Sequence, residues 1–218
     1  MQWEISFVLL MGLCLLVCTA PVLRTVTDSR AYTHTSFPNG TVVLLSPIGE
    51  IRTAMEKLVG GTPITHVGVV WVDACGVPFI FHTTPATGAR LELFLPWIRR
   101  ATRRSQVFVR RIQGPSLPDG ASLERALMPF LGTSYSFGFW KAVMQTWWPG
   151  MEMPRAANPK DRFCSELVAD VLARVGVLDF SASALTPRLV LPGDFWCTIR
   201  IPFVNGYTLL SLEELVYV

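Results

Sequence analysis

The chain has 218 residues, of which 50% are hydrophobic and 16% are charged, and its formal net charge is +3. This composition excludes an intrinsically disordered chain and supplies enough apolar side chains for a core. The densest basic stretch, "WIRRATRRSQVFVRR", is typical of one solvated face around a strand, so nucleic acid is not an expected partner.

An uncharged apolar segment from Ile5 to Leu23 opens the chain and is long enough to cross a bilayer as a helix. Glu4 precedes it without any Lys or Arg, and Pro21 follows its small residues, which fits a cleaved signal peptide less well. We therefore predict a transmembrane or signal-anchor segment over residues 1–23, a polar linker over 24–39 and one domain over 40–218. A cleaved signal peptide is the alternative.

Membrane orientation is inferred from the basic residues that follow the span. Arg24 and Arg30 favour a cytosolic domain behind a single-pass anchor. The sequon that begins at Asn39 would be used only in the opposite orientation.

Five cysteines are present, two of them inside the apolar segment. The spacing of Cys75, Cys164 and Cys197 indicates neither a disulfide framework nor a zinc site. We expect free thiols, and we expect no metal or other cofactor.

In chain order, hydrophobic periodicity and turn residues predict strands first and helices later. The expected strands cover residues 41–46, 65–72, 78–83, 90–98 and 106–112, and the expected helices cover 51–59, 122–131 and 162–175, with Ser122 and Asp161 as caps and Gly132 and Gly176 as stops. A short β tail closes the chain. This order predicts the α+β class.

Cys164 lies in the first turn of the last predicted helix, at the head of an apolar stripe. The stripe continues through Val168, Val171 and Val175. A buried packing cysteine explains the stripe, whereas the amides and dipole of a helix N-terminus would stabilise a reactive thiolate. The helix alone leaves both interpretations open.

Two histidines shift this balance. In "THVGVVW", alternation places His66 and Gly68 on one face of a strand, and the glycine leaves space beside the imidazole. If the following hairpin is symmetric about Ala74, His82 stands opposite His66 on that face. A thiol, a base and a group that orients the base are what nucleophilic catalysis requires.

Five stretches in this order carry a family resemblance: "ITHVGVVW", "FIFHTTPATGARLELF", "LGTSYSFGFW", "RFCSELVADVLARVG" and "LTPRLVLPGDF". Over about residues 40 to 200 the chain resembles the circularly permuted, papain-like thiol hydrolases of the NlpC superfamily, YiiX-like branch. The resemblance implies an antiparallel sheet or barrel packed against the helix that carries the cysteine.

The resemblance also implies roles for single residues. Cys164 would be the nucleophile, His66 the general base and His82 the third polar residue. Tyr135, as a residue that lines the cleft, and Gly68, which leaves space beside His66, are the candidate binding residues. Three positions depart from the pattern. His82 stands where the branch often has glutamate and is more similar to the lecithin retinol acyltransferase group, Ser136 stands where aspartate is common, and "PNGTVVLL" replaces a Gly-Asp opening.

Three functions follow as hypotheses. The first is a membrane-anchored thiol hydrolase, an amidase or peptidase that acts on a peptide-like substrate. The second is a lipid acyl hydrolase or acyltransferase, which His82 and the Trp-rich "KAVMQTWWPGM" favour. The third is a membrane-tethered interaction module that kept the fold without the chemistry.

Overall fold

The computed structural model describes residues 37–49, 62–136, 161–183, 185–198 and 200–215. The predicted N-terminal anchor, nearly all of the linker and the helix expected over residues 51–59 lie outside these ranges. Within them, no helix is both long enough and apolar enough to span a bilayer.

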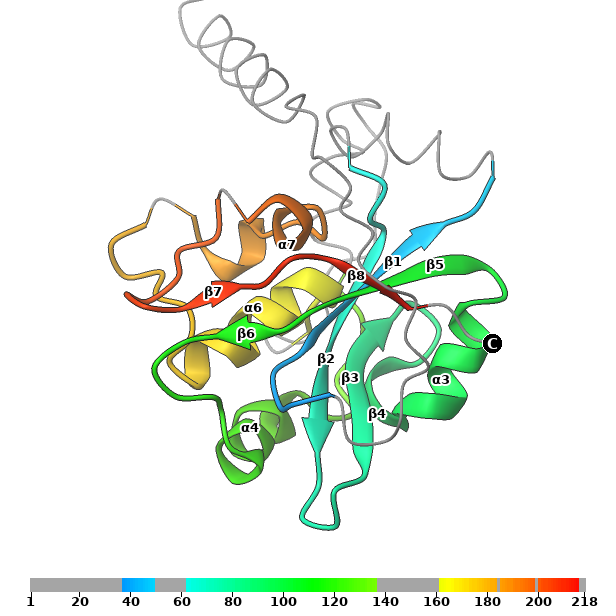
Figure 1. Cartoon of the computed structure of the whole chain (residues 1–218), viewed down its shortest axis with the longest axis horizontal. Helices are drawn as coiled ribbons and strands as arrows, with labels where there is room; N and C mark the ends of the chain where they lie inside the picture. The colour runs from blue at the N-terminus through cyan, green and yellow to red at the C-terminus, as the bar shows by residue number, and fades with distance from the viewer. Residues whose placement is uncertain (1–36, 50–61, 137–160, 184, 199, 216–218) are drawn as a thin grey trace, which may run out of the picture.

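One six-stranded antiparallel sheet forms the centre of the fold, in the order β4-β3-β2-β1-β5-β8 (Figure 1). Its strands are β1 (Val42–Pro47), β2 (His66–Val72), β3 (Pro78–Thr84), β4 (Gly88–Leu93), β5 (Ser105–Arg110) and β8 (Glu213–Leu215). A separate two-stranded pair joins β6 (Ile112–Gln113) to β7 (Thr208–Leu209). The prediction of an α+β fold with an antiparallel sheet is confirmed.

Helices pack on both faces of the sheet, as Figure 1 shows for α6 and α3. They are α3 (Phe94–Ala101), α4 (Gly120–Leu127), α6 (Cys164–Arg174) and α7 (Asp194–Cys197), with short 3-10 turns at η1 (Met128–Phe130) and η2 (Pro187–Leu189). Side chains of β2 alternate between the two faces. Val67 and Val69 pack in the core cluster beneath α6, whereas Val70 packs in the second cluster, beneath α3.

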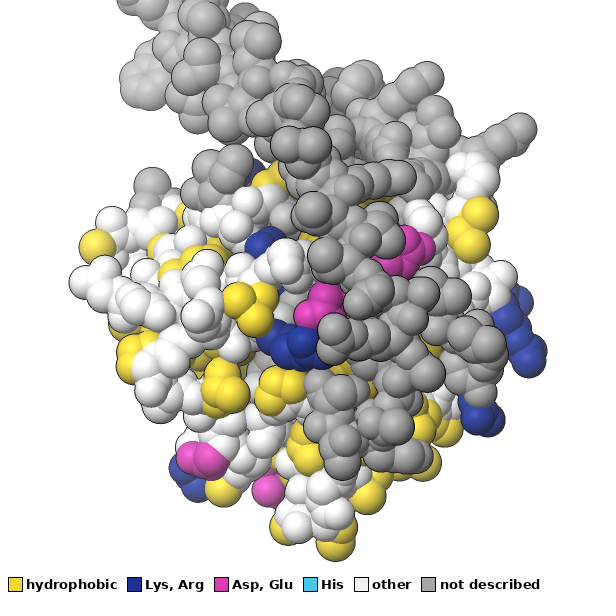
Figure 2. All heavy atoms as spheres, viewed as in Figure 1, with side chains coloured by type: hydrophobic (Ala, Val, Ile, Leu, Met, Phe, Trp, Pro, Cys, Tyr) yellow, Lys and Arg dark blue, Asp and Glu magenta, His cyan; other side chains and the backbone are white. Residues whose placement is uncertain are grey.

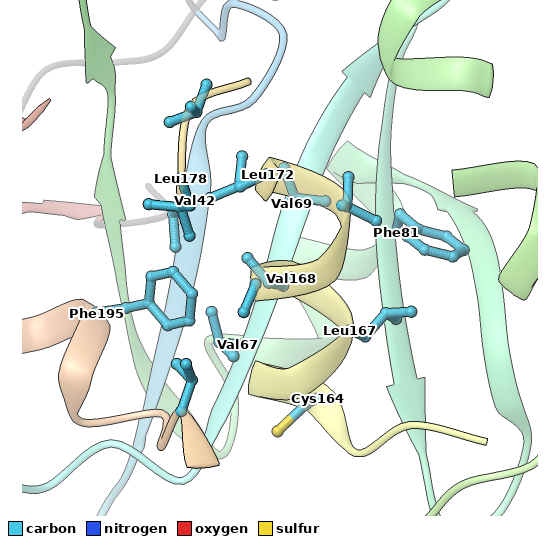
Figure 3. Packing of buried hydrophobic residues seen from close by; sticks show 14 of the residues in the cluster. Val42, Val67, Val69, Phe81, Cys164, Leu167, Val168, Leu172, Leu178 and Phe195 are labelled. Atoms are coloured by element: carbon cyan, nitrogen blue, oxygen red, sulfur yellow. The ribbon is translucent and has the colours of Figure 1, made fainter. Parts of the chain in front are cut away.

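The cluster beneath α6 is the larger of the two. Figure 3 shows Leu167, Val168 and Leu172 of α6 packed over the sheet, with Phe195 of α7 on one side and Phe81 of β3 on the other. On the face of the molecule in Figure 2, hydrophobic side chains are scattered among polar and charged ones instead of forming one continuous patch.

The strand expected over residues 90–98 is wrong beyond Leu93, because α3 begins at Phe94. Phe94, Trp97 and Ile98 are buried at helical spacing, and together they cover the second core cluster. The two arginines in the last turn, Arg99 and Arg100, suit the negative end of the helix dipole.

Two predicted helix caps are also corrected. Helix α4 is capped by Asp119, whose carboxylate accepts the backbone N–H of Ser122 at 2.7 Å. Helix α6 starts after Phe163, and Asp161 instead accepts the backbone N–H of Ser134 at 3.1 Å. The predicted stop at Gly176 is confirmed: its φ of 74° is left-handed, which glycine adopts without steric cost.

Arg110 at the end of β5 is buried and binds backbone carbonyls on two later segments. Its guanidinium donates to Leu210 at 2.7 Å, Trp196 at 3.0 Å, Leu209 at 3.0 Å and Phe195 at 3.1 Å. One side chain therefore joins the central sheet to α7 and to the C-terminal segment.

Candidate active site

His66 and His82 lie side by side on β2 and β3. The observed register pairs Val69 with Phe81, so its continuation places His82 across from Gly68. The predicted pairing, symmetric about Ala74, is therefore wrong, because Asp73 closes the turn and the hairpin is centred one residue later. Moving the centre by one residue moves the partner of each strand residue by two, so both imidazoles stay on one face. His66 Nε2 lies 3.0 Å from His82 Nδ1.

Glu92 of β4 extends this pair into a series of three side chains. Its Oε1 accepts from His82 Nε2 at 2.9 Å and from Arg90 at 2.6 Å, and its Oε2 accepts from Arg100. Glu92 was not among the predicted site residues. The signal was present in "ARLELF", because β4 pairs Arg90 with His82 and alternation then returns Glu92 to the same face.

The ionisation of these groups follows from burial and from their neighbours. Burial lowers the pKa of His66 to about 3, and the neighbouring His82 adds to that effect. Burial also lowers the pKa of His82, although Glu92 opposes the shift. Burial alone would raise the pKa of Glu92, but its bond with His82 and the charges of Arg90 and Arg100 lower it overall. At neutral pH the site holds two neutral imidazoles and one carboxylate.

These ionisation states determine both histidine tautomers. A carboxylate only accepts hydrogen bonds, so Glu92 requires the proton of His82 on Nε2. Nδ1 of His82 is then an acceptor, and His66 must donate to it from Nε2. The unprotonated and basic nitrogen of His66 is therefore Nδ1.

Cys164 is the first residue of α6 and its side chain is buried. The backbone N–H groups of Val67, Ser165 and Cys164 itself lie near enough to the sulfur to favour its thiolate form. Figure 3 shows the sulfur at the start of α6, close to Val67. Burial raises the pKa of the Cys164 thiol to about 11, although these three amides act in the opposite direction. The resting side chain is a neutral thiol.

The thiol and the base start from adjacent backbone positions, because Val67 follows His66 directly. They approach β2 from opposite faces: Val67 belongs to the cluster beneath α6, and His82 contacts Trp97 of α3 at 5.6 Å between ring centroids. Between these described side chains, no hydrogen bond joins Cys164 Sγ to the ring of His66. The structure thus brings His66 and His82 into direct contact and places Cys164 at the neighbouring amide.

A cavity of about 340 Å³ opens on the α3 face beside the two histidines. The described residues that line it are Leu45, His66, His82, Thr84, Arg90, Glu92, Trp97, Arg100, Ala101, Arg104 and Ser105. Cys164 is not among them. The cavity is therefore open to the base and its two partners, and the thiol lies behind β2.

The other two predicted site residues lie outside this lining. A Cβ on Gly68 would come within 2.8 Å of Ile80 Cδ1 and 3.1 Å of the Phe81 carbonyl, so the glycine permits close packing of β2 on β3. Tyr135 is half-buried, pairs with Arg162 in an isolated bridge and packs against the cluster beneath α6.

Metal ligation was tested on the same part of the chain. The described ranges contain no group of three His, Cys, Asp or Glu side chains placed to hold a metal ion. His82 uses both of its nitrogens on His66 and Glu92, so these three side chains bind one another in series and do not converge on a common point.

Comparison with known proteins identifies the fold. No protein-family model and no curated protein matches the sequence. Among solved structures, the crystal structure of the metalloprotein yiiX (DUF1105) from Escherichia coli O157:H7 matches with a TM-score of 0.50 and 16% sequence identity, over 81% of this chain and 98% of that chain. The chain therefore has the YiiX fold, as its sequence motifs suggested.

Proposed function

We propose that the chain is a thiol hydrolase that cleaves an amide bond of a peptide-like substrate by acyl transfer. The observation that carries the proposal is the series Glu92–His82–His66, which leaves a basic Nδ1 on His66, and the amide of the next residue, Val67, lies near Cys164 Sγ. A half-buried carboxylate, an orienting group and a base arranged in series are the supports that a nucleophile needs.

In the first half of the reaction, His66 Nδ1 takes the proton of Cys164 as Sγ attacks the substrate carbonyl. The S–C bond forms, the C–N bond breaks, and the imidazolium returns its proton to the departing amine. In the second half, water gives a proton to His66 and attacks the thioester carbonyl, the C–S bond breaks to release the acid, and His66 returns its proton to the departing sulfur. The backbone N–H of Cys164 is a candidate donor to the oxyanion.

General-base activation fits this site better than a resting thiolate–imidazolium pair. The pKa of His66 is lowered to about 3 and that of Cys164 is raised to about 11, each chiefly by burial, so both groups rest neutral at pH 7. Proton transfer then accompanies attack on the carbonyl. The thiol and the imidazole are not hydrogen-bonded and approach β2 from opposite faces, so the proposal requires their side chains to meet around the start of this strand, at His66, when substrate binds.

A lipid acyl hydrolase or acyltransferase is the second candidate. The apolar part of the cavity wall, made by Leu45, Trp97 and Ala101, favours it, since an acyl chain could lie there. The N-terminal span belongs to both proposals and would hold the domain at a membrane surface.

The deciding experiment traps the acyl-enzyme. The full chain is incubated with N-acyl amides and, in parallel, with acyl esters; intact-mass spectrometry detects any acyl adduct, and peptide mass spectrometry after proteolysis locates it. We expect an adduct on Cys164 in the wild type, loss of turnover by more than about 10³-fold in Cys164→Ala and His66→Ala, and normal turnover in the matched control Cys75→Ser. Adduct formation from esters alone would favour the lipid enzyme.

Turnover that survives without Cys164 would refute the proposal. If the wild type forms no adduct and turns over neither substrate class, the chain is better explained as a module that retains the fold alone.

A further inference from the structure

The cavity beside the histidines carries an excess of positive charge. Among the described residues of its wall, three arginines face one carboxylate: Arg90, Arg100 and Arg104 against Glu92. The two histidines of the wall are neutral at pH 7 because burial lowers the pKa of each. The wall therefore holds about two positive charges that it does not itself neutralise.

The acceptors of Glu92 are already occupied. Its Oε1 binds His82 and Arg90, and its Oε2 binds Arg100. A guanidinium has five N–H donors, so most donors of Arg90 and Arg100 remain after these contacts. Nε of Arg90 is buried and has no partner among the described residues.

Arg104 is the third cation and differs from the other two. It is exposed, it lines the cavity, and no described acidic side chain forms an ion pair with it. Arginine presents a planar fork of donors that matches the two oxygens of a carboxylate or phosphate. An arginine that has no acidic partner among the described residues and lines a positively charged cavity is suited to such an anion.

The remaining wall is partly apolar, with Thr84 and Ser105 as its polar side chains. Leu45 of β1 and the α3 residues Trp97 and Ala101 contribute to it, next to the imidazole of His66. A ligand that fills the cavity therefore needs an apolar portion as well as an anionic group.

We propose that this cavity is the recognition subsite of the enzyme and that it selects an acyl substrate bearing a carboxylate or phosphate, which Arg104 and Arg90 bind. The proposal rests on the proposed hydrolase function: His66 lines the same cavity and would lie beside the bound substrate, whose acyl carbonyl must reach Cys164 around the start of β2. It adds the chemical class of the substrate: anionic and amphiphilic.

The test measures binding separately from chemistry. The full-length Cys164→Ala protein is titrated with decanoylglycine and its neutral counterpart decanoylglycinamide, and then with decyl phosphate and decanol, by following the fluorescence of its tryptophans. We expect each anionic probe to bind at least about 10-fold more tightly than its neutral counterpart. We expect the difference to shrink as salt is raised. The relative affinity of the two anionic probes distinguishes a carboxylate from a phosphate source.

Two arginine variants supply the matched comparison. Arg104→Gln should weaken binding of the anionic probes by about 10-fold and leave the neutral ones unchanged. Arg103→Gln, an exposed neighbour outside the described lining, should have no effect. Equal affinity for anionic and neutral probes, or equal binding by Arg104→Gln and wild type, would overturn the proposal. Because no turnover is involved, either result leaves the hydrolase proposal to its own acyl-enzyme test.

Discussion

The imidazoles of His66 and His82 meet edge to face, with 83° between the ring planes and 3.0 Å between Nε2 of the first and Nδ1 of the second. His82 is nearly inaccessible, at 3% exposure, so solvent cannot replace either of its two partners. Through this contact Glu92 fixes the tautomer of His66, although the hydrogen bond of Glu92 is to His82. Four predictions test this arrangement and its surroundings.

Glu92→Gln should lower kcat by about 10²-fold with little change in KM, because an amide can donate to His82 and so permit the wrong tautomer. The acidic limb of the kcat/KM profile should also move to lower pH, since the carboxylate opposes the lowering of the His82 pKa. The measurement is a pH–rate profile with the best amide substrate. Glu213→Gln, which removes the partner of Arg111 outside the cavity, is the control. An unchanged profile would show that Glu92 does not orient the base.

Stability should fall in acid because of His66. Its folded pKa is about 3 and its ordinary value is 6.5, so between these values the unfolded chain binds a proton that the folded chain does not. The free energy of unfolding therefore decreases as pH drops below about 6.5, by up to about 3 kcal/mol near pH 4.5 from this group. Urea unfolding at pH 7 and about pH 4.5 should show a smaller loss in His66→Gln than in wild type. Equal losses in both proteins would mean that His66 is not buried neutral.

Cys164 should be slow to alkylate in the free protein. With its pKa raised to about 11 by burial, its thiolate fraction at pH 8 is about 10²-fold below that of an ordinary thiol. Iodoacetamide labelling followed by peptide mass spectrometry should show the exposed Cys75 reacting first and Cys164 gaining rate only toward pH 11. Rapid labelling of Cys164 below pH 8 would instead indicate a resting thiolate–imidazolium pair.

Gly68→Ala should destabilise the fold by about 1–3 kcal/mol, since the added methyl group would overlap Ile80 Cδ1 at 2.8 Å. The double variant Gly68→Ala/Ile80→Val removes that atom and should be more stable than the single glycine variant by chemical denaturation. Ile80→Val alone, which costs about 1 kcal/mol, is the reference. If the double variant is the less stable of the two, the Ile80 contact is not the cause.

The prediction that the two histidines share one face of the sheet was correct even though the predicted strand register was not. Strand alternation has a period of two, so a register that is wrong by two residues still leaves His66 and His82 on the same side. The contact between Nε2 and Nδ1 could not be predicted, because it depends on the true centre of the turn.

Helix α3 and Glu92 show where local patterns were insufficient. "LFLPWI" has the apolar density of a strand, and its helical signal was Pro96, which occupies the first turn, where a missing N–H costs no hydrogen bond. The role of Glu92 requires the β3–β4 register and the approach of Arg100 from α3, both of which are tertiary. The placement of Cys164 at the start of a buried helix followed from the sequence alone, but the face from which it approaches β2 did not.

Arg110 makes completion of the fold depend on the end of the chain. All four of its carbonyl acceptors lie between residues 195 and 210, after the cysteine helix, so a chain still being synthesised presents this cation without its partners. Leaving a buried guanidinium unpartnered is costly. A chain cut short before Phe195 would keep every residue of the Glu92–His82–His66–Cys164 set and yet lack all four acceptors of this guanidinium. We expect chaperones and proteases to treat such truncated products as unfolded chains.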